Sequence, residues 1–573
     1  MHTSERRERG RLIAALLPND SGRVLPVFLT ASVFLLGLYP YWCALLAGAF
    51  LAASLFHSVR KKQSLSFPLS LPSVTVCVAV FFYLIVVCWA VDRGMAFLGF
   101  LTYLPAVLLI ILAATTCTDR ERLLRSLARA GGFSVAVCMA LCAIPDLREA
   151  FFPGGRFSGP FQYANAYGLF LLASIVILCK KKPLPKSDYV LCALSALGVF
   201  LTGSRSLFVL AIAVLALLAF INWRFALFSA AGAGVAVLLA SLFAMTGALQ
   251  RSGDISLTTG EWLTRLAYYR DGLSLIGERP FGLGHSGWWY MQPVIQTSVY
   301  DARLIHSWLL QTALDIGVIP ALLLAAGAVA LFFHKGHGFR EKLLIALVLG
   351  HGMIDFDLAY LPVVFILVLL LPYGRTIKLD VTRSRKIIPL AMCVVAAGVS
   401  LWLGTASFLS SIGLDKAAAA LYPSYTEAME KVIVTEPDPA EAFIWADRIL
   451  NLNRYVFDAY DVKARVYADN GEWMDAVAMK TEFLSISRLQ GRDYDELLMY
   501  IHFAIQEAAK AGDVAICRKL ADQALGIPGI LDELSDSLSP LAYRIKQQPT
   551  LVLSDDSTRF LEYLKEFRAT LGG

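Results

Sequence analysis

The chain has 573 residues, of which 57% are hydrophobic and only 17% are charged. Soluble domains are about 45–50% apolar and about 25% charged, so this composition excludes an ordinary soluble protein and indicates many membrane spans. The ten cysteines show no CxxC or Cys/His spacing, which gives no indication of a zinc site or a disulfide framework. The net charge of +6 becomes informative when the basic residues are located along the chain.

About thirteen apolar runs approach the ~20 residues that a helix needs to cross a bilayer. They lie at 24–40, 42–57, 73–91, 95–115, 126–144, 163–180, 187–203, 205–221, 225–246, 312–333, 341–355, 358–372 and 387–410. The sequence therefore predicts an all-α, polytopic protein of about 12–13 transmembrane helices.

Basic clusters separate these runs and predict their orientation. They read ERRERGR at 5–11, VRKK at 59–62, DRERLLR at 119–125, KKK at 180–182, HKGHGFREK at 334–342 and RTIKLDVTRSRK at 375–386. Placing all of them in the cytoplasm satisfies the positive-inside rule. We then expect a cytoplasmic N-terminus at 1–23 and an uncleaved first span, because no short apolar region with a cleavage site follows it. The outer face receives 145–162, the turn at 203–205, the long loop 247–311, the turn near 355–358 and everything after 411.

Three glycines in RPFGLGHSGWWY, residues 279–290, match the G-x-G-x-x-G dinucleotide-binding fingerprint. The stretch follows YYRDGLSLIGE rather than a buried strand, and no βαβ unit surrounds it, so the motif lacks the context that makes it specific. We expect the glycines to shape a tight loop at the membrane surface. Trp288, Trp289 and Tyr290 are then expected to be interfacial anchors.

From about residue 412 the sequence becomes amphipathic and helical, with short turns. The segment DPAEAF is typical of a helix start, with Asp438 as N-cap and Pro439 in the first helical position. Gly471 in ADNGEWMDA aligns with Gly512 in AKAGDVAIC, as in a degenerate tetratricopeptide array. We expect a soluble, extracytoplasmic helical-repeat domain over 412–573, which either binds protein partners or only caps the outer face.

Polar side chains at membrane depth are costly and are therefore candidates for function. Several map to the outer half of the predicted bundle: Arg156, Gln162, Tyr163, Asn165, Arg205, Arg265, Arg270, His306, Gln311, Asp315, His351 and Asp355. Each also has a structural explanation, since arginines reach headgroups, Asn165 can cap its helix, and His351 and Asp355 lie one helical turn apart as a buried pair. Their convergence on one face favours a site.

Clustered arginines indicate phosphate binding, because guanidinium stays charged and binds phosphate oxygens in pairs. A phosphate at this depth implies a lipid phosphate or diphosphate. We expect no metal and no other cofactor, with arginines stabilising the charge. A diphosphate leaves readily, whereas an attacking sugar hydroxyl needs a base, and His306 is the best-placed candidate.

The segments GPFQYANAYG, LTGSRS, RLAYYRDGLSLIGERPFGLGHSGWWY and HSWLLQTALDIGVIPALLL together resemble the bacterial O-antigen ligase and O-antigen polymerase family. The similarity spans roughly 150–375. In that family a His-Asn pair opens a span and a Glu-hydrophobic-Gly element follows; here the pair is His306-Ser307 and Asp315 takes the Glu position. The resemblance implies a GT-C-like transmembrane catalytic domain over 24–411 in the bacterial inner membrane. It also implies metal-independent, inverting transfer of glycan from an undecaprenyl-diphosphate carrier on the outer face.

By motif position, the resemblance implies that Arg205 and Arg265 contact the diphosphate and that His306 is the base or orients the acceptor. The residues expected to bind substrate are Arg156, Asn165, Arg270, Gln311 and Asp315. A growing glycan would be the acceptor of a polymerase and a lipid A-core-type molecule that of a ligase; nucleic acid is not an expected partner. The alternatives are a transporter or flippase for lipid-linked sugars and a non-enzymatic envelope assembly protein.

Overall fold

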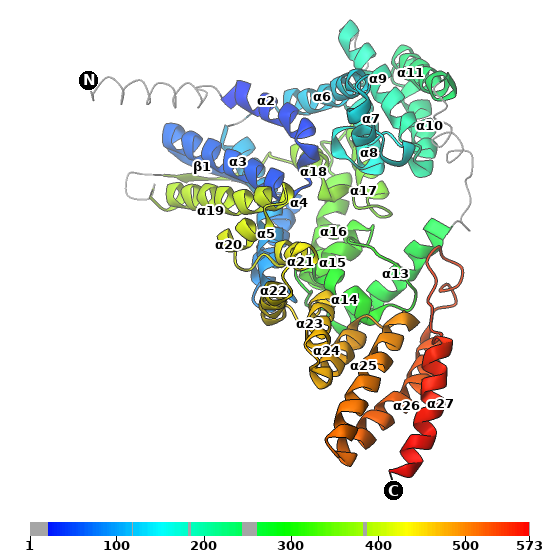
Figure 1. Cartoon of the computed structure of the whole chain (residues 1–573). Helices are drawn as coiled ribbons and strands as arrows, with labels where there is room; N and C mark the ends of the chain where they lie inside the picture. The colour runs from blue at the N-terminus through cyan, green and yellow to red at the C-terminus, as the bar shows by residue number, and fades with distance from the viewer. Residues whose placement is uncertain (1–20, 117, 181–184, 243–259, 382–386, 572–573) are drawn as a thin grey trace.

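The computed structural model describes residues 21–116, 118–180, 185–242, 260–381 and 387–571, and these are mainly helical (Figure 1). Residues 1–20 of the expected cytoplasmic segment and residues 247–259 of the predicted long loop lie outside the described residues. The all-α fold class is confirmed.

Each predicted apolar run corresponds to helix in the described chain. The helices are α2 (Ser21–Phe34), α3 (Tyr41–Lys62), α4 (Leu71–Val86), α5 (Arg93–Thr116), α6 (Arg120–Leu141), α8 (Ala164–Leu178), α9 (Lys186–Leu201), α10 (Arg205–Ala219), α11 (Trp223–Leu242), α15 (Trp308–Ile316), α16 (Val318–Phe332), α17 (Phe339–His351), α18 (Leu361–Leu370) and α19 (Ile387–Ser411). By length and composition, α3, α5, α6 and α19 are able to cross a membrane, and seven shorter helices are also apolar. These are the features of a multi-pass membrane protein.

The remaining elements lie between and after these helices. They are β1 (Ser64–Pro68), β2 (Thr376–Asp380), α7 (Pro145–Phe151), α13 (Gly260–Glu278), α14 (Gly287–Ile295), α20 (Asp415–Leu421), α21 (Thr426–Thr435), α22 (Pro439–Leu452), α23 (Phe457–Asp469), α24 (Trp473–Ile486), α25 (Gly491–Lys510), α26 (Val514–Ser537) and α27 (Asp555–Thr570). Short 3-10 turns cover Leu36–Leu38, Pro153–Gly155, Gly159–Phe161 and Asp357–Ala359.

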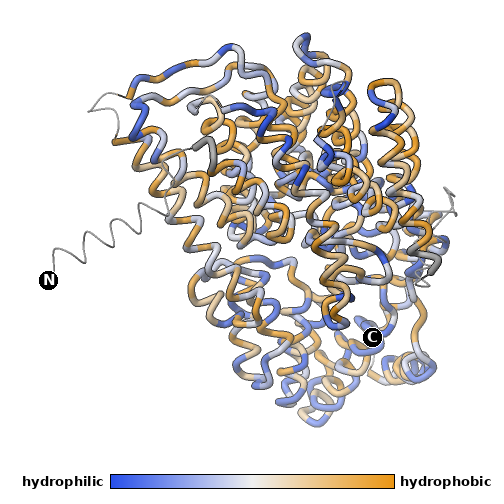
Figure 2. The backbone as a smooth tube through the Cα atoms, turned by 90° about the horizontal axis from the view of Figure 1, so that it is seen from above, coloured by the Kyte–Doolittle hydropathy of each residue, from blue (hydrophilic) through white to orange (hydrophobic). Residues whose placement is uncertain are grey.

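The core of the bundle lies around α8, whose residues are buried without exception from Ala166 to Leu178. This helix packs against α6, α9 and α17. By contrast, α19 leaves most of its apolar surface uncovered, with side chains such as Met392 and Val395 exposed. Exposed apolar faces of this size are unfavourable in water and suit a lipid environment. Figure 2 shows long apolar stretches in one part of the molecule and, in another part, helices in which polar and apolar residues are mixed.

The described basic clusters meet at one end of the bundle. Strands β1 and β2 pair antiparallel, which joins the VRKK cluster to the cluster after α18. The Lys62 ammonium donates to the Thr115 carbonyl at 3.0 Å, next to the start of α6. There, Glu121 forms ion pairs with Lys180 at 2.7 Å and with Arg340 at 2.9 Å. This grouping is what the positive-inside argument requires of these clusters, while the membrane side that they face stays a prediction.

The predicted span 312–333 is divided into two helices by Gly317, which has a φ of +95°. The glycine loop of the fingerprint packs against this break. The Leu283 backbone N–H donates to the Leu314 carbonyl at 2.7 Å, and a Cβ at Gly282 would lie 2.6 Å from the Gly317 nitrogen. The prediction of a tight loop is therefore confirmed, and close packing of two backbones explains Gly282.

The prediction of interfacial anchors in this loop is wrong for Trp288 and Tyr290. Trp288 is fully buried, and its indole N–H donates to the Ala302 carbonyl at 2.7 Å. Tyr290 is 5% exposed. An aromatic ring with a polar tip is buried readily when the tip finds a partner, so these rings form a core instead of facing headgroups.

The helices after residue 412 follow one another, and from α20 each packs against the next helix in the chain (Figure 1). The predicted start of α22 is confirmed, since Asp438 accepts a hydrogen bond from the Ala440 N–H at 3.0 Å and Pro439 is the first helical residue. Gly471 and Gly512 have φ values of +79° and +73° and occupy the α23–α24 and α25–α26 turns. The tetratricopeptide-like assignment and the boundaries 1–23, 24–411 and 412–573 stay predictions.

Candidate functional site

A cavity of about 1000 Å³ opens between α8, α10, α13, α17 and the loop before α15. Five residues predicted for the site line it together: Arg156, Asn165, Arg205, Arg265 and His306. They come from four separate stretches of the chain, so their convergence is a property of the fold. Other polar residues on the wall are Tyr163, Ser204, Ser206, Glu261, Tyr268, Asp301, His351, Lys546 and Gln547.

Arg205 begins α10 directly after a tight turn that Gly203 permits with a φ of +59°. Arg156 supports this turn, because its Nε donates to the Thr202 carbonyl at 2.9 Å and its Nη2 donates to Asn165 Oδ1 at 2.6 Å. The Arg205 guanidinium lies 4.0 Å from the exposed carboxylate of Glu261 at the start of α13. Arg205 therefore points into the cavity from a rigid turn.

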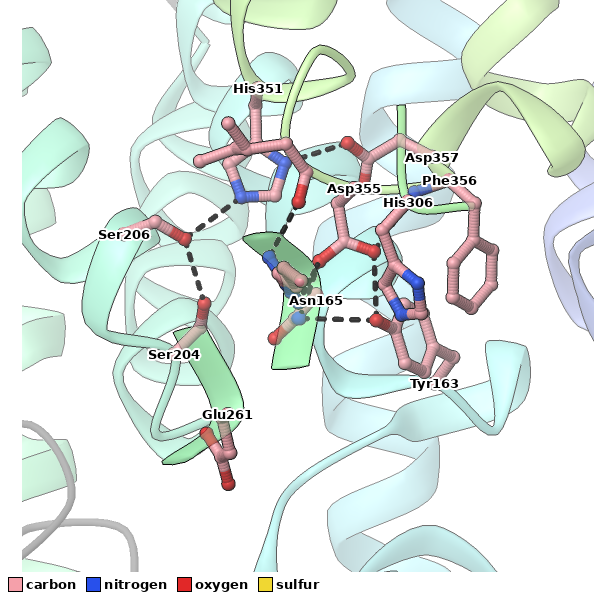
Figure 3. A network of polar contacts seen from close by, with 12 residues as sticks. Tyr163, Asn165, Ser204, Ser206, Glu261, His306, His351, Asp355, Phe356 and Asp357 are labelled. Atoms are coloured by element: carbon pink, nitrogen blue, oxygen red, sulfur yellow. Dashed lines mark hydrogen bonds and ion pairs between the residues drawn. The ribbon is translucent and has the colours of Figure 1, made fainter. Parts of the chain in front are cut away.

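Asp355 is the centre of the polar network behind the cavity wall (Figure 3). Its carboxylate accepts hydrogen bonds from the Tyr163 hydroxyl at 2.8 Å and from Asn165 Nδ2 at 2.7 Å. Arg265 Nη2 lies 3.3 Å from the same carboxylate, and Arg265 Nη1 donates to the Ile354 carbonyl at 2.5 Å. Because Asp355 is only 1% exposed, it fixes the guanidinium without filling the cavity.

The expected pairing of His351 with Asp355 on one helical face is wrong. Helix α17 ends at His351, so the following residues leave the helical path. The His351 ring instead contacts Asp357 Oδ2 through Nδ1 at 2.6 Å and the Ser206 hydroxyl through Nε2 at 3.0 Å. This second network links α17 to α10 beside Arg205. Asn165 is likewise not a helix cap, since it lies inside α8 and bonds to Asp355.

His306 lies in the loop before α15 with a φ of +50°, a conformation that costs energy for a side-chain-bearing residue. Its Nδ1 is 2.9 Å from the Leu304 carbonyl, which is only an acceptor, so Nδ1 carries the proton. Burial lowers the pKa of His306 to about 4, with Asp355 opposing and Arg265 reinforcing this shift. The ring is therefore neutral at pH 7, and its Nε2 holds a free lone pair.

Packing fixes the plane of this imidazole. Tyr268 stacks at 5.6 Å between ring centroids, and Phe356 meets the ring edge-on at 4.9 Å. The Tyr269 hydroxyl donates to the His306 carbonyl at 2.7 Å and restrains the backbone. A neutral, oriented imidazole on the wall of a cationic cavity presents a lone pair that can accept a proton, although its low pKa makes it a weaker base than an ordinary histidine.

Gln311 and Asp315, which were expected to bind substrate, lie behind the loop and do not line this cavity. Gln311 Oε1 accepts a hydrogen bond from the Ile305 N–H at 2.9 Å, and its Nε2 donates to Asp315 at 2.8 Å. The Tyr83 hydroxyl also donates to Asp315, at 2.9 Å. These two residues hold the backbone next to His306.

Arg270, the remaining predicted binding residue, also lies off the cavity wall. Its Nη1 donates to the Ser539 hydroxyl at 3.2 Å, which joins α13 to the C-terminal region. The structure thus divides the predicted site residues into five on the wall and three that support it.

Several wall residues were not predicted from the sequence. Ser206 and Tyr268 belong to motifs that were recognised, so neighbouring residues gave a signal for them. Asp357, the second carboxylate of IDFD, is buried behind the wall, where it contacts His351. Lys546 and Gln547 are far away in the sequence, and no local pattern marks them. In the described part of the chain, no group of three or more His, Cys, Asp or Glu residues is placed to hold a metal ion.

Comparison with known proteins matches one part of the chain to a protein family. Residues 190–325 match the family model for O-antigen ligase, and this segment contains Arg205, Arg265 and His306. No curated protein and no solved structure matches the chain. The match supports the assignment to the O-antigen ligase/polymerase family that the motifs indicated.

Proposed function

We propose, with this family assignment as the premise, that the chain is a membrane glycosyltransferase that uses a lipid-diphosphate-linked glycan as donor. The donor is carried by undecaprenyl diphosphate, and the acceptor is a sugar or lipid hydroxyl on the outer face of the bacterial inner membrane. The observation that supports this most strongly is the meeting of Arg205, Arg265 and His306 in one cavity.

The arginines suit the diphosphate. A sugar diphosphate diester carries one negative charge on each phosphate, and guanidinium groups bind such oxygens while remaining charged. Arg265 is held by the buried Asp355, and Arg205 by a turn that Arg156 supports, so both are oriented before substrate binds. Oriented charges that need no rearrangement stabilise the negative charge that develops on the leaving group.

His306 suits the acceptor. We assign its Nε2 as the atom that takes the proton from the attacking hydroxyl, because Nδ1 is committed to the Leu304 carbonyl. The hydroxyl oxygen forms a bond to the anomeric carbon while the bond from that carbon to the diphosphate oxygen breaks. The electron pair leaves with undecaprenyl diphosphate, and attack opposite the leaving group inverts the anomeric centre.

The test is transfer of glycan by the purified full-length protein from a lipid-diphosphate-linked donor, with and without EDTA. We expect transfer that survives EDTA and is lost in Arg265→Ala. Arg279→Ala is the matched control, because Arg279 is exposed on the segment after α13 and does not line the cavity. A transporter or an assembly protein would show no transfer, and normal surface glycan in an Arg205→Ala strain would also contradict the proposal.

A gel of surface glycan from a deletion strain then identifies the acceptor. Loss of long chains with single repeats still attached would indicate a polymerase. Loss of all attached glycan, together with accumulation of lipid-linked polymer, would indicate a ligase.

A further inference from the structure

The segment Ser539–Gln547, between α26 and α27, returns from the C-terminal helices to the cavity; we call it the C-terminal strap. Two hydrogen bonds fix its first residue, Ser539. The Ser539 N–H donates to the Thr297 carbonyl at 2.8 Å, and its hydroxyl accepts a hydrogen bond from Arg270 at 3.2 Å. Both partners belong to the segments that carry the candidate site.

Apolar side chains hold the rest of the C-terminal strap. Ala542 and Ile545 are buried, and Leu541 packs against the cluster around Tyr268 and Trp288. A Cβ at Gly260, the first residue of α13, would lie 3.7 Å from the backbone nitrogen of Lys546. The next residues, Lys546 and Gln547, are exposed, and both line the cavity.

Lys546 differs from the arginines of the cavity in its contacts. Arg265 is paired with Asp355, and Arg205 has Glu261 nearby. Arg156 donates to a backbone carbonyl and to an amide oxygen. Within the described residues, the Lys546 ammonium makes no ion pair and no hydrogen bond. It is therefore a cation that can meet an incoming anion without breaking a contact in the protein.

We propose that the C-terminal strap completes the substrate site and that Lys546 binds an anionic oxygen of the lipid-linked donor; this rests on the proposed function. The anion is either a phosphate oxygen of the diphosphate or an acid group of the glycan, and both would be met by the same ammonium. Gln547 lies beside it with a donor and an acceptor suited to sugar hydroxyls. The C-terminal helices thereby contribute to donor recognition.

The experiment compares the full-length wild type with Lys546→Ala, Lys546→Glu, Lys546→Arg and Arg544→Ala. Arg544 is the matched control, because it is an exposed cation on the same strap that does not line the cavity. We expect the donor KM to rise about three- to tenfold in Lys546→Ala and further in Lys546→Glu, with kcat changed less than about twofold. Lys546→Arg restores the KM, and Arg544→Ala leaves it unchanged.

Binding of undecaprenyl diphosphate to the same proteins in lipid nanodiscs distinguishes the two anions. Weaker binding of this sugar-free probe by Lys546→Ala identifies the diphosphate as the partner; weakening only with the glycan-bearing donor identifies an acid group on the sugar. Wild-type affinity and KM in both Lys546→Ala and Lys546→Glu would overturn the inference while transfer by the wild type still stood. Absence of transfer by the wild type would instead overturn the proposed function, and the binding comparison would continue to test Lys546.

Discussion

Two buried carboxylates belong to networks next to the loop that carries His306, and each accepts hydrogen bonds from one tyrosine hydroxyl and one side-chain amide. The donors are Tyr163 and Asn165 for Asp355, and Tyr83 and Gln311 for Asp315. The networks differ in what else they contact. Asp355 holds Arg265 at the cavity, whereas among the described residues Asp315 has no arginine partner and is fully buried.

The Asp355 and Asp315 networks therefore contain the same kinds of residue but have different roles. Where a guanidinium joins the network and a cavity opens beside it, the carboxylate presents a positive charge to a ligand. Where no guanidinium joins the network, the carboxylate satisfies buried groups and fixes the chain, here through Gln311 and the Ile305 N–H. Substitution of Asp355 should therefore change mainly glycan transfer, whereas substitution of Asp315 should change mainly stability.

The largest effect is expected for His306→Ala, which removes the base that the two networks flank. Transfer should fall about 10²- to 10⁴-fold, the usual contribution of a general base. The measurement is kcat with saturating donor and acceptor in purified protein. Donor affinity close to that of the wild type would show that the loss is chemical; a drop below about tenfold would contradict the role of His306.

Asp355→Ala should have the next largest effect, because it removes the ion pair of Arg265 and the carboxylate that accepts from the Tyr163 hydroxyl and from Asn165 Nδ2. We expect kcat/KM for the donor to fall about 10- to 100-fold. Asp355→Asn keeps the size of the side chain and removes the charge, so its kcat/KM for the donor should be reduced within the same range. A variant with normal kcat/KM would mean that Arg265 is oriented without this carboxylate.

Asp315→Ala should act mainly on stability. It leaves the Tyr83 hydroxyl and the Gln311 amide without their acceptor in a buried site, which costs about 1–3 kcal/mol for such groups. A thermal unfolding scan in detergent should give a lower Tm, with transfer by the remaining folded protein reduced less than about tenfold. Unchanged Tm together with loss of transfer would place Asp315 in the chemistry and remove the contrast with Asp355.

The smallest effect is expected from pH. With a pKa of about 4, His306 stays neutral as pH falls from 8 to about 5, so kcat/KM should not decrease through this group until pH approaches 4. A decrease centred near about 6.5 would show an ordinary histidine pKa. Since the folded pKa is below that of the unfolded chain, the unfolded state binds protons more readily between these values. Stability should therefore fall as pH falls from about 6.5 towards 4.

The sequence predicted those parts of the molecule that depend on local patterns. Apolar runs located the helices, and loose motifs located Arg156, Arg205, Arg265 and His306, which all line one cavity. The arginines could be recognised because several charged residues converge on one face of an otherwise apolar bundle, where charge is costly.

The contact partners of individual side chains could not be predicted. The pairing of His351 with Asp355 assumed that a helix continued to Asp355, whereas it ends at His351 and brings Asp357 to the ring instead. Trp288 was expected at a lipid surface because aromatic residues favour it, but an acceptor on the Ala302 carbonyl made burial favourable. Both errors came from contacts that the local sequence does not encode.

The residues that line the cavity are as far apart in the sequence as Arg156 and Gln547, and this separation along the chain has a consequence for biosynthesis. A chain emerging from the ribosome can insert its apolar helices and bring the arginines together long before its last helices exist. The wall closes only when nearly the whole polypeptide has been translated and its final segment has docked. Premature termination after α19 would therefore leave a membrane-embedded product whose cavity stays incomplete on one side.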